Sequence, residues 1–246
     1  MKTTFYQIGL NKRIAQVSDL HSRNCQELLI HLKQAKPDYI FVTGDTFERK
    51  GKIEFDPCRH SAAYHLFKKL AYQFLGSSEK PLDANAYEFL HSAVAIAPVY
   101  LSLGNHEWYL RRADLDFFAS NNIVLLDNRD VESADFLIGG LSSKADEEWL
   151  KCFKAKASLK PKLLLCHHPE YFVKYDLGSF DVVFSGHAHG GQLRIAGHSL
   201  YAPGQGFWPK ITRGVYFEGH LVVSGGVANT LAIPRFNNET ELVIVD

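Results

Sequence analysis

Five short polar strings, each placed directly after an apolar stretch, hold most of the side chains in this chain that suit catalysis. They are Asp19-Leu20-His21, Gly44-Asp45, Gly104-Asn105-His106-Glu107, His167-His168-Pro169 and Gly186-His187-Ala188-His189. Together they supply carboxylates, one carboxamide and several imidazoles. This mixture of donors suits borderline divalent metal ions, and two adjacent ions of that kind are typical of phosphate ester hydrolysis.

The strings differ in how specific they are. Two imidazoles two residues apart and flanked by glycines, as in His187 and His189, are unusual in a purely structural loop. Asn105 offers one neutral oxygen as a ligand, and the adjacent His106 points elsewhere, which frees it for acid or base work near neutral pH. His167 follows a Leu-Leu-Leu-Cys run, where a polar residue without a function is poorly placed.

Asp19, His21 and Asp45 carry weaker signals, since each alone also fits an ordinary loop or turn. Asp19 and His21 share a face of a straight strand but lie too far apart for one ion, so they require a backbone bend. Asp45 follows a glycine, which tolerates unusual φ, and its two carboxylate oxygens suit a position between two ions.

We do not expect the remaining histidines or the cysteines to take part in catalysis. The histidines expected to be solvated or half-buried are His31, His60, His65, His91, His198 and His220. The cysteines are scattered without a CxxC pair, which indicates free thiols in a reducing compartment. They are Cys25, Cys58, Cys152 and Cys166.

Strand-like and helix-like segments alternate through most of the chain. Strands that end at the polar strings are expected at residues 13–18, 39–43, 99–103, 162–166 and 182–185. Helices are expected at residues 24–35 (with Asn24 and Glu27 as a capping box), near 63–74, at 86–97 and near 114–120, with a loop at 76–81. Further strands are expected at residues 123–126, 136–139, 193–195, 215–217, 221–224 and 241–245. This order predicts an α/β sandwich whose polar strings gather at the carboxyl ends of the strands.

Composition narrows the functional classes. The 246 residues suffice for one large domain, and 27 basic residues balance 27 acidic ones. That balance argues against a broad nucleic-acid surface, although it leaves room for a local patch. No long uninterrupted apolar stretch or signal-peptide pattern is present, so we expect a cytoplasmic protein without a transmembrane segment and leave peripheral membrane contact open.

Taken in order, these strings resemble the calcineurin-like metallophosphoesterase superfamily. Later strings, such as Gly190-Gly191-Gln192 and the segment 233–237, resemble its bacterial YkuE/YaeI-type phosphodiesterase branch. The resemblance implies a four-layer α/β/β/α sandwich, here a single domain over residues 1–246 with a helical insertion around 49–97. It also implies a metal-dependent phosphoesterase, most closely a phosphodiesterase, acting on a small-molecule phosphoester.

The resemblance further implies two divalent metal ions, Mn²⁺, Fe²⁺ or Zn²⁺. The implied ligands are Asp19, His21 and His189 for the first metal, Asn105, His167 and His187 for the second, and Asp45 between them. A hydroxide held by both ions attacks phosphorus in such enzymes, and His106 then protonates the leaving group. His168 occupies the free position of its motif and is not counted as a ligand.

Glu48 departs from the commonest family pattern, and Arg49 follows it directly in the sequence. Glu48 stands where many members have the second Asp of Gly-Asp-x-x-Asp, and we predict that it pairs with His106. Arg49 is expected to contact the phosphate, with an exposed surface charge as the alternative.

Two other functions stay open from the sequence: a non-catalytic scaffold of the same fold and a nuclease of the same superfamily. The substrate also stays open, because aromatic residues fit the rim of the site and the core equally. These are Trp108, Tyr109, Phe207 and Trp208.

Overall fold

The computed structural model describes residues 1–49, 82–107, 109–202, 204–229 and 235–246. The helix expected near 63–74, the loop at 76–81 and Trp108 lie outside these residues. The single domain with an insertion therefore stays a prediction.

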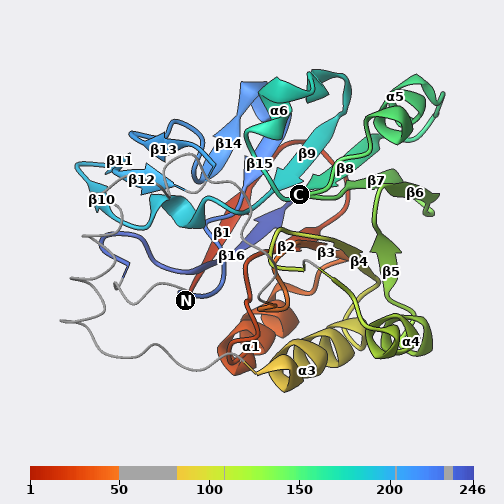
Figure 1. Cartoon of the computed structure of the whole chain (residues 1–246), viewed down its shortest axis with the longest axis horizontal. Coiled ribbons are helices and arrows are strands. Elements are labelled where there is room, and N and C mark those ends of the chain that lie inside the picture. Colours follow the sequence, from red (N-terminus) through yellow and green to blue (C-terminus); the bar gives the residue numbers. More distant parts are fainter. Residues whose placement is uncertain (50–81, 108, 203, 230–234) are drawn as a thin grey trace.

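Two six-stranded sheets form the centre of the structure (Figure 1). In spatial order the first sheet contains β1 (Lys2–Tyr6), β16 (Glu241–Val245), β2 (Ile14–Val17), β3 (Tyr39–Thr43), β4 (Val99–Ser102) and β5 (Val124–Leu126). The second contains β14 (Gly214–Tyr216), β15 (Leu221–Val223), β9 (Val182–Ser185), β8 (Lys162–Cys166), β7 (Leu137–Leu141) and β6 (Arg129–Glu132). β2, β3 and β4 run parallel to one another, as do β8 and β9, so the polar strings leave these strands at the same end.

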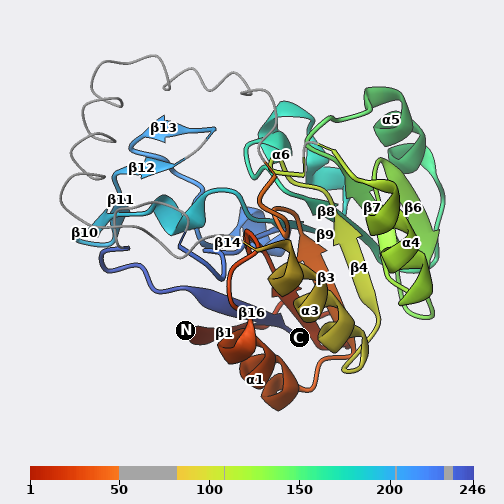
Figure 2. The same cartoon turned by 60° about the horizontal axis from the view of Figure 1, so that its bottom comes forward.

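Helices cover the outer face of each sheet (Figure 2). The first sheet is covered by α1 (Gln26–Ala35), α3 (Asp83–Val94) and α4 (Arg112–Ser120). The second is covered by α5 (Glu147–Ala155) and the short α6 (Tyr171–Lys174). The predicted α/β/β/α order of layers is therefore confirmed.

Alternating side chains along the strands fill three apolar clusters. On β3, Phe41 faces the space between the sheets, whereas Ile40 and Val42 pack under the helices of the first layer. Phe184 of β9 meets Phe41 edge to face between the sheets, with ring centroids 5.3 Å apart. Burial of both faces explains why these strands read as continuous apolar runs.

Short elements follow the last polar string. They are the 3-10 turn η3 (His189–Gly191), the pairs β10 (Arg194–Ile195) with β11 (His198–Ser199) and β12 (Tyr201–Ala202) with β13 (Gly206–Phe207), and the turn η4 (Phe217–Gly219). Another 3-10 turn, η2 (Leu177–Ser179), precedes β9. In both views the two hairpins lie beside η3 (Figures 1 and 2).

The structure corrects one local expectation. Asn24 accepts a hydrogen bond from the backbone of Gln26, but Glu27 pairs with the amino group of Met1 at 2.7 Å and does not complete a capping box. No helix among the described residues is long and apolar enough to span a membrane.

Candidate metal centre

Tight loops place the predicted ligands at the carboxyl ends of the strands. Five of the seven have φ between +47° and +65°, a region rarely occupied by non-glycine residues. They are Asp19, His21, Asp45, His187 and His189. The bend required between Asp19 and His21 is therefore present, and the strain fits a functional site.

Backbone hydrogen bonds hold the loops against one another. His21 N donates to Asp45 O at 2.8 Å, which ties the loop after β2 to the loop after β3. His187 N lies 3.2 Å from both carboxylate oxygens of Asp19, which ties the first sheet to the second. The site therefore lies where the two sheets meet.

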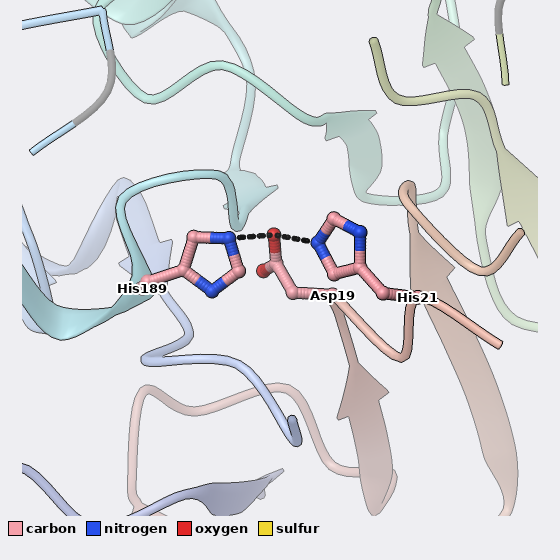
Figure 3. Close-up of side chains that lie close together, drawn as sticks. All are labelled: Asp19, His21 and His189. Atoms are coloured by element: carbon pink, nitrogen blue, oxygen red, sulfur yellow. Dashed lines mark ion pairs between the residues drawn. The ribbon is translucent and has the colours of Figure 1, made fainter. Parts of the chain in front are cut away.

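A first group of ligand atoms consists of Asp19, His21 and His189, all within 4.8 Å of one another. Figure 3 shows the Asp19 carboxylate between the two imidazoles, with Oδ1 3.8 Å from His21 Nε2 and 3.5 Å from His189 Nε2. Burial favours the neutral acid, but His189 and His21 outweigh it and keep the pKa of Asp19 below its ordinary value. The carboxylate is therefore ionised, as a metal ligand must be.

A second group consists of Asp45, His167 and His187, again within 4.8 Å of one another. Asp45 Oδ2 lies 3.2 Å from His167 Nε2 and 3.5 Å from His21 Nε2, so this one oxygen reaches both groups. Asp45 is thus placed between the two groups.

Several buried atoms at this point form no hydrogen bond. They are His21 Nε2, His167 Nε2 and Asn105 Oδ1. Buried polar atoms are rarely left unsatisfied, and two imidazole nitrogens with a carboxamide oxygen are suitable donors for a divalent ion. The residues present therefore fit the metals that the resemblance implies.

The opposite ring nitrogens of these histidines are held by acceptors. His167 Nδ1 lies 2.7 Å from the carbonyl oxygen of Thr43, and His21 Nδ1 lies 2.6 Å from Glu48 Oε2. Each contact holds a proton on Nδ1, so that Nε2 is the nitrogen that would bind a metal ion.

Glu48 contacts two histidines. The predicted contact with His106 is present, with Oε1 3.1 Å from Nδ1, while Oε2 contacts His21. Burial lowers the pKa of His106, but Asp45 and Glu48 outweigh it and raise the pKa above its ordinary value. The contact with His21 was not predicted, because sequence spacing does not show that one carboxylate reaches both rings.

Glu107 is a further residue to which the sequence assigned no role. Its carboxylate accepts the backbone N–H groups of Asp45, Phe47 and Gly104, each at 2.8 Å. A Cβ atom on Gly104 would lie 2.1 Å from Asp45 Oδ1, so only glycine allows this close approach. Glu107 thus joins the loops after β3 and β4.

Arg49 is not the exposed charge considered as one alternative, because it is only 5% exposed. Its guanidinium pairs with both carboxylate oxygens of Asp114 at the start of α4 and lies 3.3 Å from Asp83 of α3. Phosphate contact by Arg49 stays a prediction, and the observed contacts connect the Asp45 loop to the helix layer.

Arg235 and His168 lie beside the predicted ligands. Arg235 Nη2 is 3.3 Å from His189 Nδ1, and burial lowers the pKa of this arginine to about 10. His168 contacts Ser143 Oγ at 2.9 Å through Nε2 and Glu170 through Nδ1. His168 belongs to the same string as His167, where it was not counted as a ligand, and no role was assigned to Arg235 from the sequence.

Comparison with known proteins agrees with the fold. The sequence profile of the calcineurin-like phosphoesterase family matches residues 12–191. YpbG of Bacillus subtilis (strain 168), an uncharacterized protein, is 24% identical over 239 residues, covering 93% of this chain and 78% of its own length. The uncharacterized metallophosphoesterase YkuE of the same organism is 25% identical, covering 94% of this chain and 77% of its own length.

A shorter match and one solved structure complete the comparison. The uncharacterized metallophosphoesterase Cj0846 of Campylobacter jejuni is 34% identical over 103 residues, covering 38% of this chain and 28% of its own length. The structure of phosphopantetheinyl hydrolase from Mycobacterium tuberculosis aligns with a TM-score of 0.44 at 11% identity, covering 87% of this chain and 89% of that one. Because the family profile spans most of the sequence, this chain belongs to the calcineurin-like phosphoesterase family.

Proposed function

We propose that this protein is a dinuclear metal-dependent phosphoesterase that hydrolyses phosphodiester, phosphomonoester or pyrophosphate bonds, with phosphodiesters as the expected substrates. The observation that supports this most directly is the position of Asp45 Oδ2, 3.2 Å from His167 Nε2 and 3.5 Å from His21 Nε2. One carboxylate oxygen between two buried ligand groups is what two neighbouring ions require.

We assign Asp19, His21 and His189 to one ion and Asn105, His167 and His187 to the other, with Asp45 shared. Two bound divalent ions supply Lewis acidity toward the phosphate and a nucleophile of lowered pKa. The identity of the ions, Mn²⁺, Fe²⁺ or Zn²⁺, is part of the proposal.

His106 is the proposed proton donor to the leaving group. Its side chain is 36% exposed, whereas those of His21 and His167 are 1% and 0% exposed, so it is the imidazole placed to meet a substrate. Glu48 accepts its Nδ1 proton and fixes the ring, and Nε2 lies 3.9 Å from Asp45 Oδ2, beside the proposed ions.

The experiment is metal reconstitution of the purified, chelator-stripped protein. We expect hydrolysis of bis-p-nitrophenyl phosphate with Mn²⁺, Fe²⁺ or Zn²⁺, and its loss in Asp45→Asn. The matched control Asp116→Asn changes an exposed carboxylate that pairs with Arg112 and should retain activity. Absence of turnover with every ion, on this substrate and on p-nitrophenyl phosphate, would favour the scaffold alternative.

A further inference from the structure

A basic hollow of about 320 Å³ lies outside the candidate metal centre, at the short hairpins that follow η3. Arg194 and His198 of β10 and β11 line it, together with Trp208 and Lys210 from the loop after β13. No carboxylate lines the hollow among the described residues. Its volume falls within the usual range for small-ligand sites.

The charge of Arg194 has no carboxylate partner among the described residues. Its Nη atoms donate to neutral oxygens only: the carbonyls of Gly190 and Gly197 and the hydroxyls of Ser199 and Thr212. These bonds fix the side chain without neutralising it. A guanidinium held in this way is ready to attract an anion.

Lys210 adds a second positive charge. It is exposed and forms no ion pair with any residue that the structure describes. Asp and Glu are absent between Asp181 and Glu218 although the chain has 27 of them, so the segment that forms the hollow carries no carboxylate of its own. The surface around the hollow is therefore positively charged although the net charge of the whole chain is zero.

Trp208 stands at the rim in an unusual conformation. Its side chain is 70% exposed and its φ is +57°, while its backbone N–H is fixed to Leu200 O at 3.0 Å. A bulky residue with positive φ is rare, and such strain concentrates at ligand-binding positions. The exposed indole is placed to cover a group attached to the bound anion.

The hollow is connected to the candidate metal centre through the backbone. Arg194 binds the carbonyl of Gly190, the residue directly after His189, and β12 packs against η3. Figures 1 and 2 show the hairpins beside this turn. The hollow is therefore linked directly to the turn that carries His189.

We propose that this hollow is a phosphate-binding site that recognises a second, non-reacting phosphate group. The group belongs either to a soluble diphosphate ester or to a lipid headgroup, since both present the same anion. As a statement about the substrate, this rests on the proposed phosphoesterase function, whereas binding of phosphate itself does not.

The first test measures binding of inorganic phosphate to protein whose candidate metal centre has been disabled. Chelator-treated Asp45→Asn protein is titrated with phosphate and followed by ³¹P line width. Adding Lys210→Glu should weaken binding about tenfold, the equivalent of one charge-assisted hydrogen bond. The control Lys151→Glu makes the same charge change on exposed α5 and should have no effect. Equal weakening by both substitutions, or none by either, would overturn the site.

The second test identifies the source of the phosphate. For a soluble diphosphate ester such as UDP-glucose, Lys210→Glu and Trp208→Ala should lower kcat/KM about tenfold more than they do for bis-p-nitrophenyl phosphate. If the lipid headgroup is the source, the same variants instead lose binding to phosphatidylglycerol vesicles, with phosphatidylcholine vesicles as the reference. If the substitutions change neither kcat/KM for the diphosphate ester nor vesicle binding, the proposal is contradicted. Inactivity toward every ester would contradict only the phosphoesterase function, and the phosphate titration would still decide the site.

Discussion

At the scale of single residues, exposure separates the imidazoles into two kinds. His21 and His167 are almost fully buried, and one ring nitrogen of each forms no hydrogen bond. The side chain of His106, by contrast, is 36% exposed. Burial suits a permanent ligand, and exposure suits a group that must meet a substrate. This difference supports the assignment of His106 to proton transfer and the others to metal binding.

His106→Ala should therefore reduce kcat about 10²- to 10⁴-fold, the usual range for a positioned acid or base. The metal content should not change, because the predicted ligands keep their contacts. Steady-state kinetics combined with elemental analysis measures both quantities. A fully active variant would remove His106 from the chemistry, and a variant without metal would make it a ligand.

At the scale of elements, the strands whose ends form the candidate site could be located from the sequence. The strands that precede the polar strings are continuous apolar runs, and each was predicted within about two residues. β1, β6, α5 and α6 were missed, as were the short strands β11, β12 and β13. β1 (Lys-Thr-Thr-Phe-Tyr) and β6 (Arg-Asp-Val-Glu) are rich in polar residues and lie at sheet edges, so they depend on their partners β16 and β7 more than on their own pattern.

The contacts between loops could not be read from the sequence. Glu107 was visible only as the last residue of Gly-Asn-His-Glu, because its bonds to the loop after β3 cross a large sequence separation. The same holds for Arg49, whose partner Asp114 lies far along the chain in α4. Such pairs follow from the completed fold, which local patterns do not encode.

Glu107→Gln tests how far the connection between loops supports the site. The amide has one accepting oxygen and presents N–H donors to backbone N–H groups, so part of the three-bond arrangement is lost. We expect destabilisation of about 1–3 kcal/mol and metal affinity about 10- to 100-fold lower. Urea unfolding and metal titration measure these effects. Unchanged metal affinity would show that the loops keep their positions without Glu107.

Asp114→Asn tests the buried pair with Arg49. Burial raises the pKa of Asp114, but Arg49 and Tyr87 outweigh it and lower the pKa below its ordinary value. The carboxylate therefore stabilises the fold above about pH 4, the ordinary aspartate range, and this contribution is lost as the pH falls further. At pH 7 the variant should lose up to about 3–5 kcal/mol, because the buried Arg49 then keeps, among the described carboxylates, only its 3.3 Å contact with Asp83.

Urea unfolding from pH 7 to pH 3.5 measures this dependence. The difference between wild type and Asp114→Asn should shrink below about pH 4. The control Asp116→Asn removes an exposed pair and should cost less than about 1 kcal/mol at every pH. A difference that is independent of pH would show that the ionised Asp114 does not carry the stabilisation.

At the scale of the whole molecule, the candidate site joins the two sheets. Asp19, His21, Asp45 and Asn105 follow strands of the first sheet, and His167, His187 and His189 follow strands of the second. The order of motifs in the sequence was enough to predict this convergence and the layered fold. The strained loops, the link from Arg194 to Gly190 and the basic hollow depended on the three-dimensional arrangement.

Because the proposed ligands come from both sheets, bound metal should stabilise the folded protein as a whole. At a free concentration of 100 times the dissociation constant, one ion contributes about 2.7 kcal/mol. For a chain of this size that corresponds to a Tm higher by about 5–10 °C. Calorimetry with Mn²⁺ and with chelator measures it, and Asp45→Asn should lose most of the shift. An identical Tm in both conditions would contradict metal binding at this junction.

The most direct measurement is anomalous diffraction from crystals grown with Mn²⁺. The account predicts two peaks about 3.5–4 Å apart, with Asp45 bound to both and with His189 and His187 bound to different ions. A single peak, or Asp45 outside the coordination sphere of either ion, would contradict it.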